Sequence, residues 1–121
     1  MEMETVILFS LLCKHAVADL AVQSLRIPSN KRLYFNKGLH IHALDHAVLT
    51  LLVLLVFSIN PWLALAFAVL DYVAHWHIDC FKSKLLWIFE IPRDGALFWR
   101  IQTCDQILHY ATYALIVYLI C

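Results

Sequence analysis

Histidines and aspartates occur in this sequence in pairs whose members stand four residues apart. An interval of four residues places two side chains on the same face of an α-helix. Neutral imidazole together with carboxylate is a common ligand set for zinc, and Mn, Fe and Ni bind such groups as well. The sequence therefore predicts a site for one or two divalent metal ions, zinc first among them. Its candidate ligands are His15, Asp19, His42, His46, His75, Asp79, Asp105 and His109.

The elements that would carry these pairs are long apolar stretches. Of the 121 residues, 63% are hydrophobic and 15% are charged, and a soluble domain of this size could not bury so much apolar surface. A helix that crosses a membrane needs about 20 mainly apolar residues. Four stretches reach that length, at about 4–23, 38–59, 61–82 and 97–121. We therefore expect an all-α fold, in which residues 1–121 form a single integral membrane domain with a bundle of four transmembrane helices.

The connections between these helices differ in character. The segment 24–37 is polar and contains Pro28, which predicts a loop. Asn60 and Pro61 indicate a tight turn in which proline opens the third helix. The segment 83–96 mixes apolar and charged residues. It predicts a short amphipathic piece that lies along the membrane surface between the third and fourth helices.

Basic residues gather in two of these connections. The first connection contains Arg26, Lys31, Arg32 and Lys37, and the third contains or adjoins Lys82, Lys84, Arg93 and Arg100. By the positive-inside rule, both connections are cytoplasmic and both termini lie on the opposite side of the membrane. The net charge is zero, so nothing indicates a nucleic-acid partner, and membrane lipid is the partner that we expect.

The four pairs also share a depth. Counted from the cytoplasmic end of each helix, they lie about 5–13 Å inward at a rise of about 1.5 Å per residue. Four helix faces at one depth can converge on a single site. His40 and His77 each stand two residues from a paired histidine. They therefore face away from the site, where we expect them to form hydrogen bonds between helices.

Asp45 and Asp71 raise the number of aspartates within the helices to five. Each unpaired aspartate at a helix centre costs about 2.5–3.5 kcal/mol on insertion scales, together about 12–18 kcal/mol. That sum exceeds the whole stability of a typical small domain, so cations must neutralise these carboxylates. Lys14 is the only lysine well inside a helix, and we expect it to pair with Asp45 or Asp71. Both aspartates are candidate catalytic residues, and the one that Lys14 leaves unpaired would act as the general base.

The motifs occur in a defined order over nearly the whole chain. They read His15-x-x-x-Asp19-x-x-x-Gln23, His42-x-x-x-His46, His75-Trp76-His77-Ile78-Asp79-x-x-Lys82 and Asp105-Gln106-x-x-His109. This order resembles an uncharacterised family of small bacterial and phage integral membrane proteins, a domain of unknown function. More distantly it is similar to membrane-bound metal-dependent hydrolases, and through them to zinc phospholipase C-like helical enzymes. The resemblance implies a bacterial inner membrane location, but Lys14, Asp45 and Asp71 stand where it implies apolar residues.

Three functions are compatible with these features. The first is a metal-dependent hydrolase that cleaves a phosphodiester or ester of a lipid or lipid-linked substrate at the cytoplasmic side. Gln23, Lys82 and Gln106 would then lie at the cytoplasmic mouth, where a phosphate would arrive. The second is a metal or proton transporter or an ion-conducting protein, although the outer halves of the second and fourth helices are apolar. The third is a membrane module without enzymatic activity, held together by a structural metal site.

Overall fold

The computed structural model describes residues 2–25 and 32–121, and this part of the chain is helical, without β-strands. Arg26, Pro28 and Lys31, on which part of the loop and topology prediction rests, lie outside the described residues. The elements are α1 (Met3–Ala16), a π-helical segment η1 (Val17–Val22), α2 (Gln23–Leu25), α3 (Lys37–Val56), α4 (Pro61–Ile88) and α5 (Ala96–Ile120). Because α1, η1 and α2 follow one another directly, the described residues form four long helical segments. The all-α prediction is confirmed.

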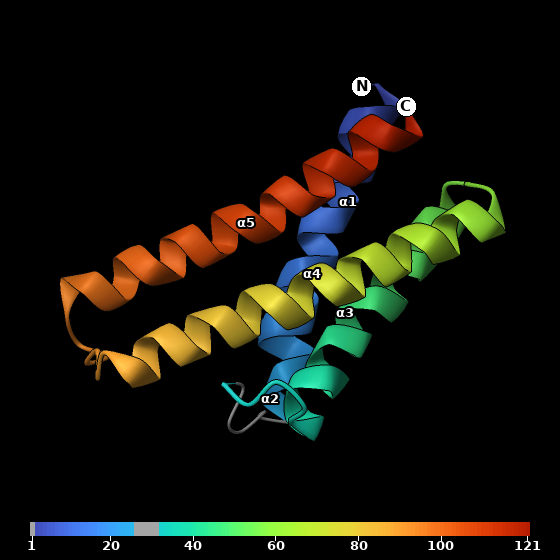
Figure 1. The fold of residues 1–121 in the computed structure, drawn as a ribbon. Helices are drawn as coiled ribbons and strands as arrows, with labels where there is room; N and C mark the ends of the chain where they lie inside the picture. Colours follow the sequence, from blue (N-terminus) through green and yellow to red (C-terminus); the bar gives the residue numbers. More distant parts are fainter. Residues whose placement is uncertain (1, 26–31) are drawn as a thin grey trace.

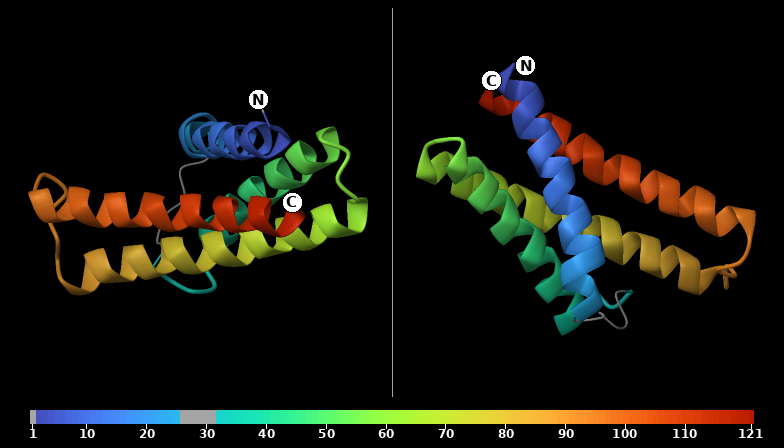
Figure 2. Two further views of the ribbon diagram at one scale, coloured as in Figure 1. Left: turned by 90° about the horizontal axis from the view of Figure 1, so that it is seen from above. Right: turned by 180° about the vertical axis from the view of Figure 1, so that it is seen from behind.

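The helical segments pack at different angles to one another (Figure 1). Helices α4 and α5 lie side by side and antiparallel, and α3 joins α4 through a short turn. Helix α1 crosses the α4–α5 pair and packs against α3 and α5, as the two further views show (Figure 2). The N- and C-termini lie at the same end of the molecule.

Two helix ends explain why the chain reverses where it does. After α3, Ser58 adopts a left-handed conformation with a φ of 58°, and the Ile59 amide donates to the Leu54 carbonyl. This is the Schellman pattern of a helix C-terminus. The Asn60 side chain then caps α4 by accepting from two backbone amides, and Pro61 occupies the first turn of the helix. The predicted tight turn is confirmed.

The connection between α4 and α5 differs from the prediction. Helix α4 continues to Ile88, so the first six residues of the expected surface-lying segment, 83–88, belong to its last turns. Residues 82–88 contain neither glycine nor proline, and nothing interrupts the helix before Glu90, which has a φ of 48°. The separate amphipathic segment was therefore a wrong prediction. The connection is a short turn, with Pro92 shortly after the end of the helix.

An apolar core fills one end of the molecule. It lies near the termini and the α3–α4 turn, and its largest buried members are Ile7, Leu11, Leu54, Phe67, Tyr113 and Ile116. The outer faces of the helices are also apolar, with exposed side chains such as Phe9, Leu52, Val69 and Leu108. Many large apolar side chains are thus exposed on the outside of the helices.

Two segments, Met3–Val22 and Lys37–Val56, are long and apolar enough to cross a membrane. Within the described residues, α4 and α5 do not meet that criterion. The polar side chains that they contribute to the interior, among them Asp71, Asp79 and Asp105, lower their apolar content. Four membrane-crossing helices were predicted, and two of the described helices are long and apolar enough to cross a membrane.

Candidate metal centre

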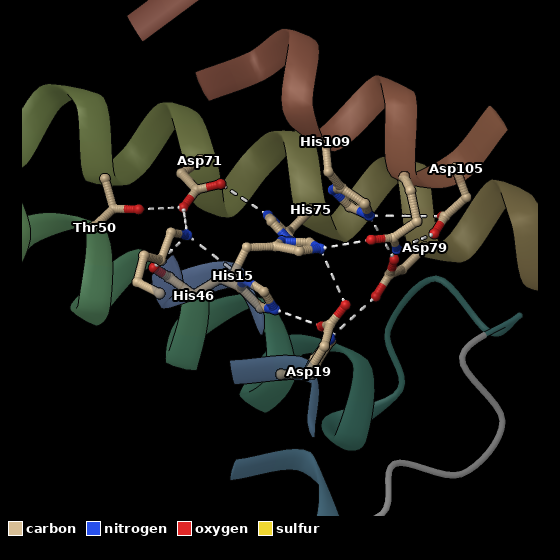
Figure 3. Close-up of polar contacts among 12 residues, drawn as sticks. His15, Asp19, His46, Thr50, Asp71, His75, Asp79, Asp105 and His109 are labelled. Atoms are coloured by element: carbon tan, nitrogen blue, oxygen red, sulfur yellow. Dashed lines mark hydrogen bonds and ion pairs between the residues drawn. The ribbon is translucent and has the colours of Figure 1, made fainter. Parts of the chain in front are cut away.

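The eight predicted ligands converge in one cluster next to the apolar core. One pair comes from α1 and η1, one from α3, one from α4 and one from α5 (Figure 3). Seven of the eight side chains are buried, and Asp19 is half-buried. The helical spacing and common depth thus correctly predicted that these residues meet. Their role as ligands stays a prediction.

Asp19 forms the centre of the first group of contacts. Its carboxylate lies 2.8 Å from His46 Nε2 and 3.2 Å from His42 Nε2 through Oδ1. Its other oxygen, Oδ2, lies 3.1 Å from His15 Nε2. The residue belongs to the π-helical segment η1, a feature that is frequent at functional sites. Three imidazoles from two helices therefore surround one half-buried carboxylate.

Asp79 and Asp105 form the centre of a second group. His109 Nε2 lies 3.1 Å from Asp79 Oδ1 and 3.6 Å from Asp105 Oδ1. His42 Nε2 lies 3.4 Å from Asp79 Oδ2, so this histidine joins the two groups. The Lys82 ammonium donates to Asp105 Oδ2 at 3.1 Å. Lys82 therefore contributes a positive charge at the edge of the cluster.

The histidine rings stack upon one another. His75 lies between His46, at a centroid distance of 3.7 Å, and His109, at 4.0 Å. Two charged rings at the separation of His46 and His75 would repel each other. Their stacking therefore favours neutral imidazole, which is the form that binds metals.

A buried ion pair orients His75. Lys14 Nζ donates to Asp71 Oδ2 at 2.7 Å, and the Thr50 hydroxyl donates to the same oxygen. The other oxygen of Asp71 lies 2.8 Å from His75 Nδ1. Because an ionised carboxylate only accepts, Nδ1 carries the proton and neutral His75 keeps a lone pair on Nε2. A carboxylate that orients a histidine in this way is the usual outer shell of a histidine ligand.

The same lysine begins a second chain of hydrogen bonds. Lys14 Nζ donates to the Tyr113 hydroxyl at 3.0 Å, and this hydroxyl lies 2.8 Å from His15 Nδ1. His15 Nε2 lies 3.1 Å from Asp19 Oδ2 and 3.0 Å from Gln106 Oε1. Lys14 thus orients two histidines through different neighbours. The expected pairing of Lys14 with one of two aspartates is made with Asp71.

Asp45 lies apart from these contacts. It is half-buried on α3 and directly precedes His46. Successive residues of a helix differ in direction by about 100°, so Asp45 lies to one side of the direction of His46. Its role as general base stays a prediction.

His40 and His77 lie outside the cluster, as predicted. His40 bonds through Nδ1 to the Tyr72 hydroxyl and through Nε2 to the Tyr34 carbonyl. His77 Nδ1 donates to the Val73 carbonyl at 2.7 Å. Both histidines have tyrosine and backbone partners on the outer side of α4, and neither contributes to the candidate metal centre.

A cavity of about 650 Å³ borders the cluster between η1 and α5. Asp19, His42 and Asp79 line its inner part. The cavity is also lined by the three residues that were predicted to lie toward the mouth of the site, Gln23, Lys82 and Gln106. The cluster is therefore accessible to a ligand.

The donor set fits a divalent cation. Three sets of residues each offer three potential ligand atoms, and within each set these atoms lie within 4.8 Å of one another. The sets are His15, His46 and His75; Asp19, His42 and His46; and Asp79, Asp105 and His109. Three buried side-chain atoms lack a hydrogen-bond partner within the described part of the chain, namely His75 Nε2, Asp105 Oδ1 and His109 Nδ1. A buried polar atom without a partner is costly. All three residues belong to these sets, and coordination of a cation would give such an atom a partner.

These observations define a class, an all-helical protein whose helices enclose a histidine- and aspartate-rich cluster able to hold metal. The family described as "Protein of unknown function (DUF3307)" matches residues 7–121, and the chain belongs to this family. No curated protein and no solved structure matches the chain significantly.

Proposed function

We propose that this protein is a membrane-embedded, divalent-metal-dependent hydrolase that cleaves an ester or phosphodiester of a lipid or lipid-linked substrate. The observation that carries the proposal is the cluster of eight convergent histidine and aspartate side chains beside an open cavity. A structural metal site is normally closed by its protein ligands, whereas a catalytic one keeps a position open. The cavity beside Asp19 and Asp79 favours the catalytic alternative.

A membrane location is supported by the outer surface. The segments Met3–Val22 and Lys37–Val56 would cross the bilayer. Helices α4 and α5 would pack beside them, with exposed residues such as Val69 and Leu108 against lipid. The first and third connections would face the cytoplasm of a bacterial cell because of their lysines and arginines. The two termini lie at the same end of the molecule, which agrees with a topology that places both on one side of the membrane.

The sets Asp19–His42–His46 and Asp79–Asp105–His109 share no residue, so the cluster offers room for one or two ions. Mixed imidazole and carboxylate ligands favour zinc, with Mn, Fe or Ni as alternatives. A cation held there would polarise the scissile bond and activate water for attack. The chain itself contributes orientation, because Asp71 holds His75 and Tyr113 holds His15. Lys82 offers a charge for an anionic group at the mouth of the cavity.

The apolar core disfavours transport. A path through the molecule needs polar lining on both sides of the cluster. Toward the termini, however, the cluster is followed by Ile7, Leu11, Leu54 and Phe67, which are buried and tightly associated. A pocket that opens on one side suits binding and catalysis.

The proposal is tested by turnover of lipid substrates. Purified protein loaded with zinc should hydrolyse a phosphodiester or ester lipid from a fluorogenic panel, and a chelator should abolish this activity. Asp79→Asn removes a carboxylate from the centre and should lower the rate by about 100-fold. Asp94→Asn, in the exposed α4–α5 turn, is the matched control and should retain the rate. Full metal occupancy without turnover of any member of the panel would contradict the hydrolase proposal.

A further inference from the structure

A second, apolar cavity lies between α4 and α5. Its volume is about 320 Å³, within the usual range for small-molecule sites. Most of its lining is apolar, including Ile78, Phe81, Leu97 and Ile101. Such a lining suits a hydrocarbon chain, because an alkyl chain leaves no polar group of its own without a hydrogen bond there.

Two cations interrupt this apolar lining. Lys82 and Arg100 both line the cavity. Lys82 donates to Asp105 at 3.1 Å, which uses one of its three N–H donors. Arg100 is exposed and makes no ion pair or side-chain hydrogen bond with the described residues. An arginine fork of this kind matches phosphate geometry.

The apolar cavity borders the candidate metal centre, because the two have lining residues in common. Lys82 and Asp105 line both this cavity and the polar one. Asp105 also belongs to a ligand set with Asp79 and His109. An amphiphile whose chain lies between α4 and α5 would therefore place its head group beside that set.

We infer that the α4–α5 cavity holds the hydrocarbon chain of a membrane lipid whose phosphate lies at Lys82 and Arg100. This inference rests on the proposed function and narrows it, because it names a phosphate-bearing lipid as the substrate class. The charge of the two cations complements phosphate, and the lining complements the chain. A lipid without an anionic group would leave Arg100 without a counter-ion.

Cys104 provides a direct test, because it lines the cavity and its side chain is exposed. Cys13 and Cys121, which are also exposed, are first replaced by serine, and the protein is placed in bilayer discs. Dodecyl phosphate should slow maleimide labelling of Cys104 by about tenfold or more, as a charge-assisted contact implies. Inorganic phosphate, which lacks a chain, and dodecyl trimethylammonium, which lacks the anion, should leave labelling unchanged.

Matched variants separate the chain from the head group. Leu97→Trp fills the cavity and should abolish protection, whereas Leu115→Trp, at an exposed leucine further along α5, should preserve it. Arg100→Gln should raise the dodecyl phosphate concentration required by about tenfold. Equal protection by the cationic amphiphile, or full protection in Leu97→Trp, would overturn the inference. The assay uses protein without added metal, so its failure is distinguishable from absence of a metal centre.

Discussion

Lys14 and Asp71 form the most consequential pair of the interior. Both side chains are almost fully buried, and their charged atoms lie 2.7 Å apart. Removing one partner of a buried pair leaves an uncompensated charge, which costs about 3–5 kcal/mol. We therefore expect Lys14→Met to lower the free energy of unfolding by about that amount, measured by reversible denaturation in mixed micelles.

Two further variants test the cause of this loss. Lys14→Met combined with Asp71→Leu removes both charges and should recover roughly half of the loss or more. Lys84→Met replaces an exposed lysine of α4 and should change stability by about 0.5 kcal/mol or less. If Lys14→Met were as stable as Lys84→Met, the ion pair would not contribute as described.

Asp71 also determines which nitrogen of His75 is free. In Asp71→Asn, the amide oxygen can accept from Lys14 while its NH₂ group donates to His75 Nδ1. His75 would then carry its proton on Nε2 and lose the lone pair that faces the centre. We expect metal affinity, measured by competition with a chelator, to fall by about 10–100-fold. Asp94→Asn is the control, and an unchanged affinity in Asp71→Asn would show that His75 is not a ligand.

At the level of single residues, much of the cluster could be predicted from the sequence, because an interval of four residues defines a helix face. The same rule would have found two residues that the sequence analysis missed. Thr50 follows His46 by four residues, and Tyr113 follows His109 by four. Lys14 pairs with Asp71 because of the way α1 and α4 are rotated relative to each other. The spacing of residues within one helix does not determine this rotation.

At the level of elements, helix ends were predicted where proline and asparagine mark them. The turn at Asn60 and Pro61 is the clearest case. The sequence prediction ends this helix at residue 82, where the apolar stretch ends, but α4 extends to Ile88. Polarity alone does not end a helix, because lysine and leucine, which occupy 84–86, both favour helix formation. The π-helical geometry of Val17–Val22 also has no signal in the composition of that segment.

Ser58 and Glu90 adopt left-handed conformations at the ends of α3 and α4, which L-residues other than glycine rarely do. Ser58→Gly should therefore stabilise the protein by about 1 kcal/mol. Ser83→Gly, inside α4, is the matched control and should destabilise it by roughly 0.5–1 kcal/mol. Both values are obtained by the same denaturation assay. A destabilising effect of Ser58→Gly would contradict the assigned helix end.

For the whole molecule, the main expectation is a membrane topology with both termini on the outer face. Glu2→Cys and the native Cys121 mark the two ends, with Cys13 and Cys104 replaced by serine. A membrane-impermeant maleimide should label both positions from the outer face of sealed cells or vesicles. Labelling of the two ends from opposite sides would exclude an even number of crossings.

The central claim is that the buried histidines and aspartates hold metal. Metal analysis of protein purified without chelator tests it most directly, alongside the double variant His46→Ala and Asp79→Ala. We expect one or two divalent ions per wild-type chain and a large loss in the double variant, which removes a member of every ligand set. Wild-type protein that is folded but contains no stoichiometric metal, and takes up none when zinc is added, would contradict the account.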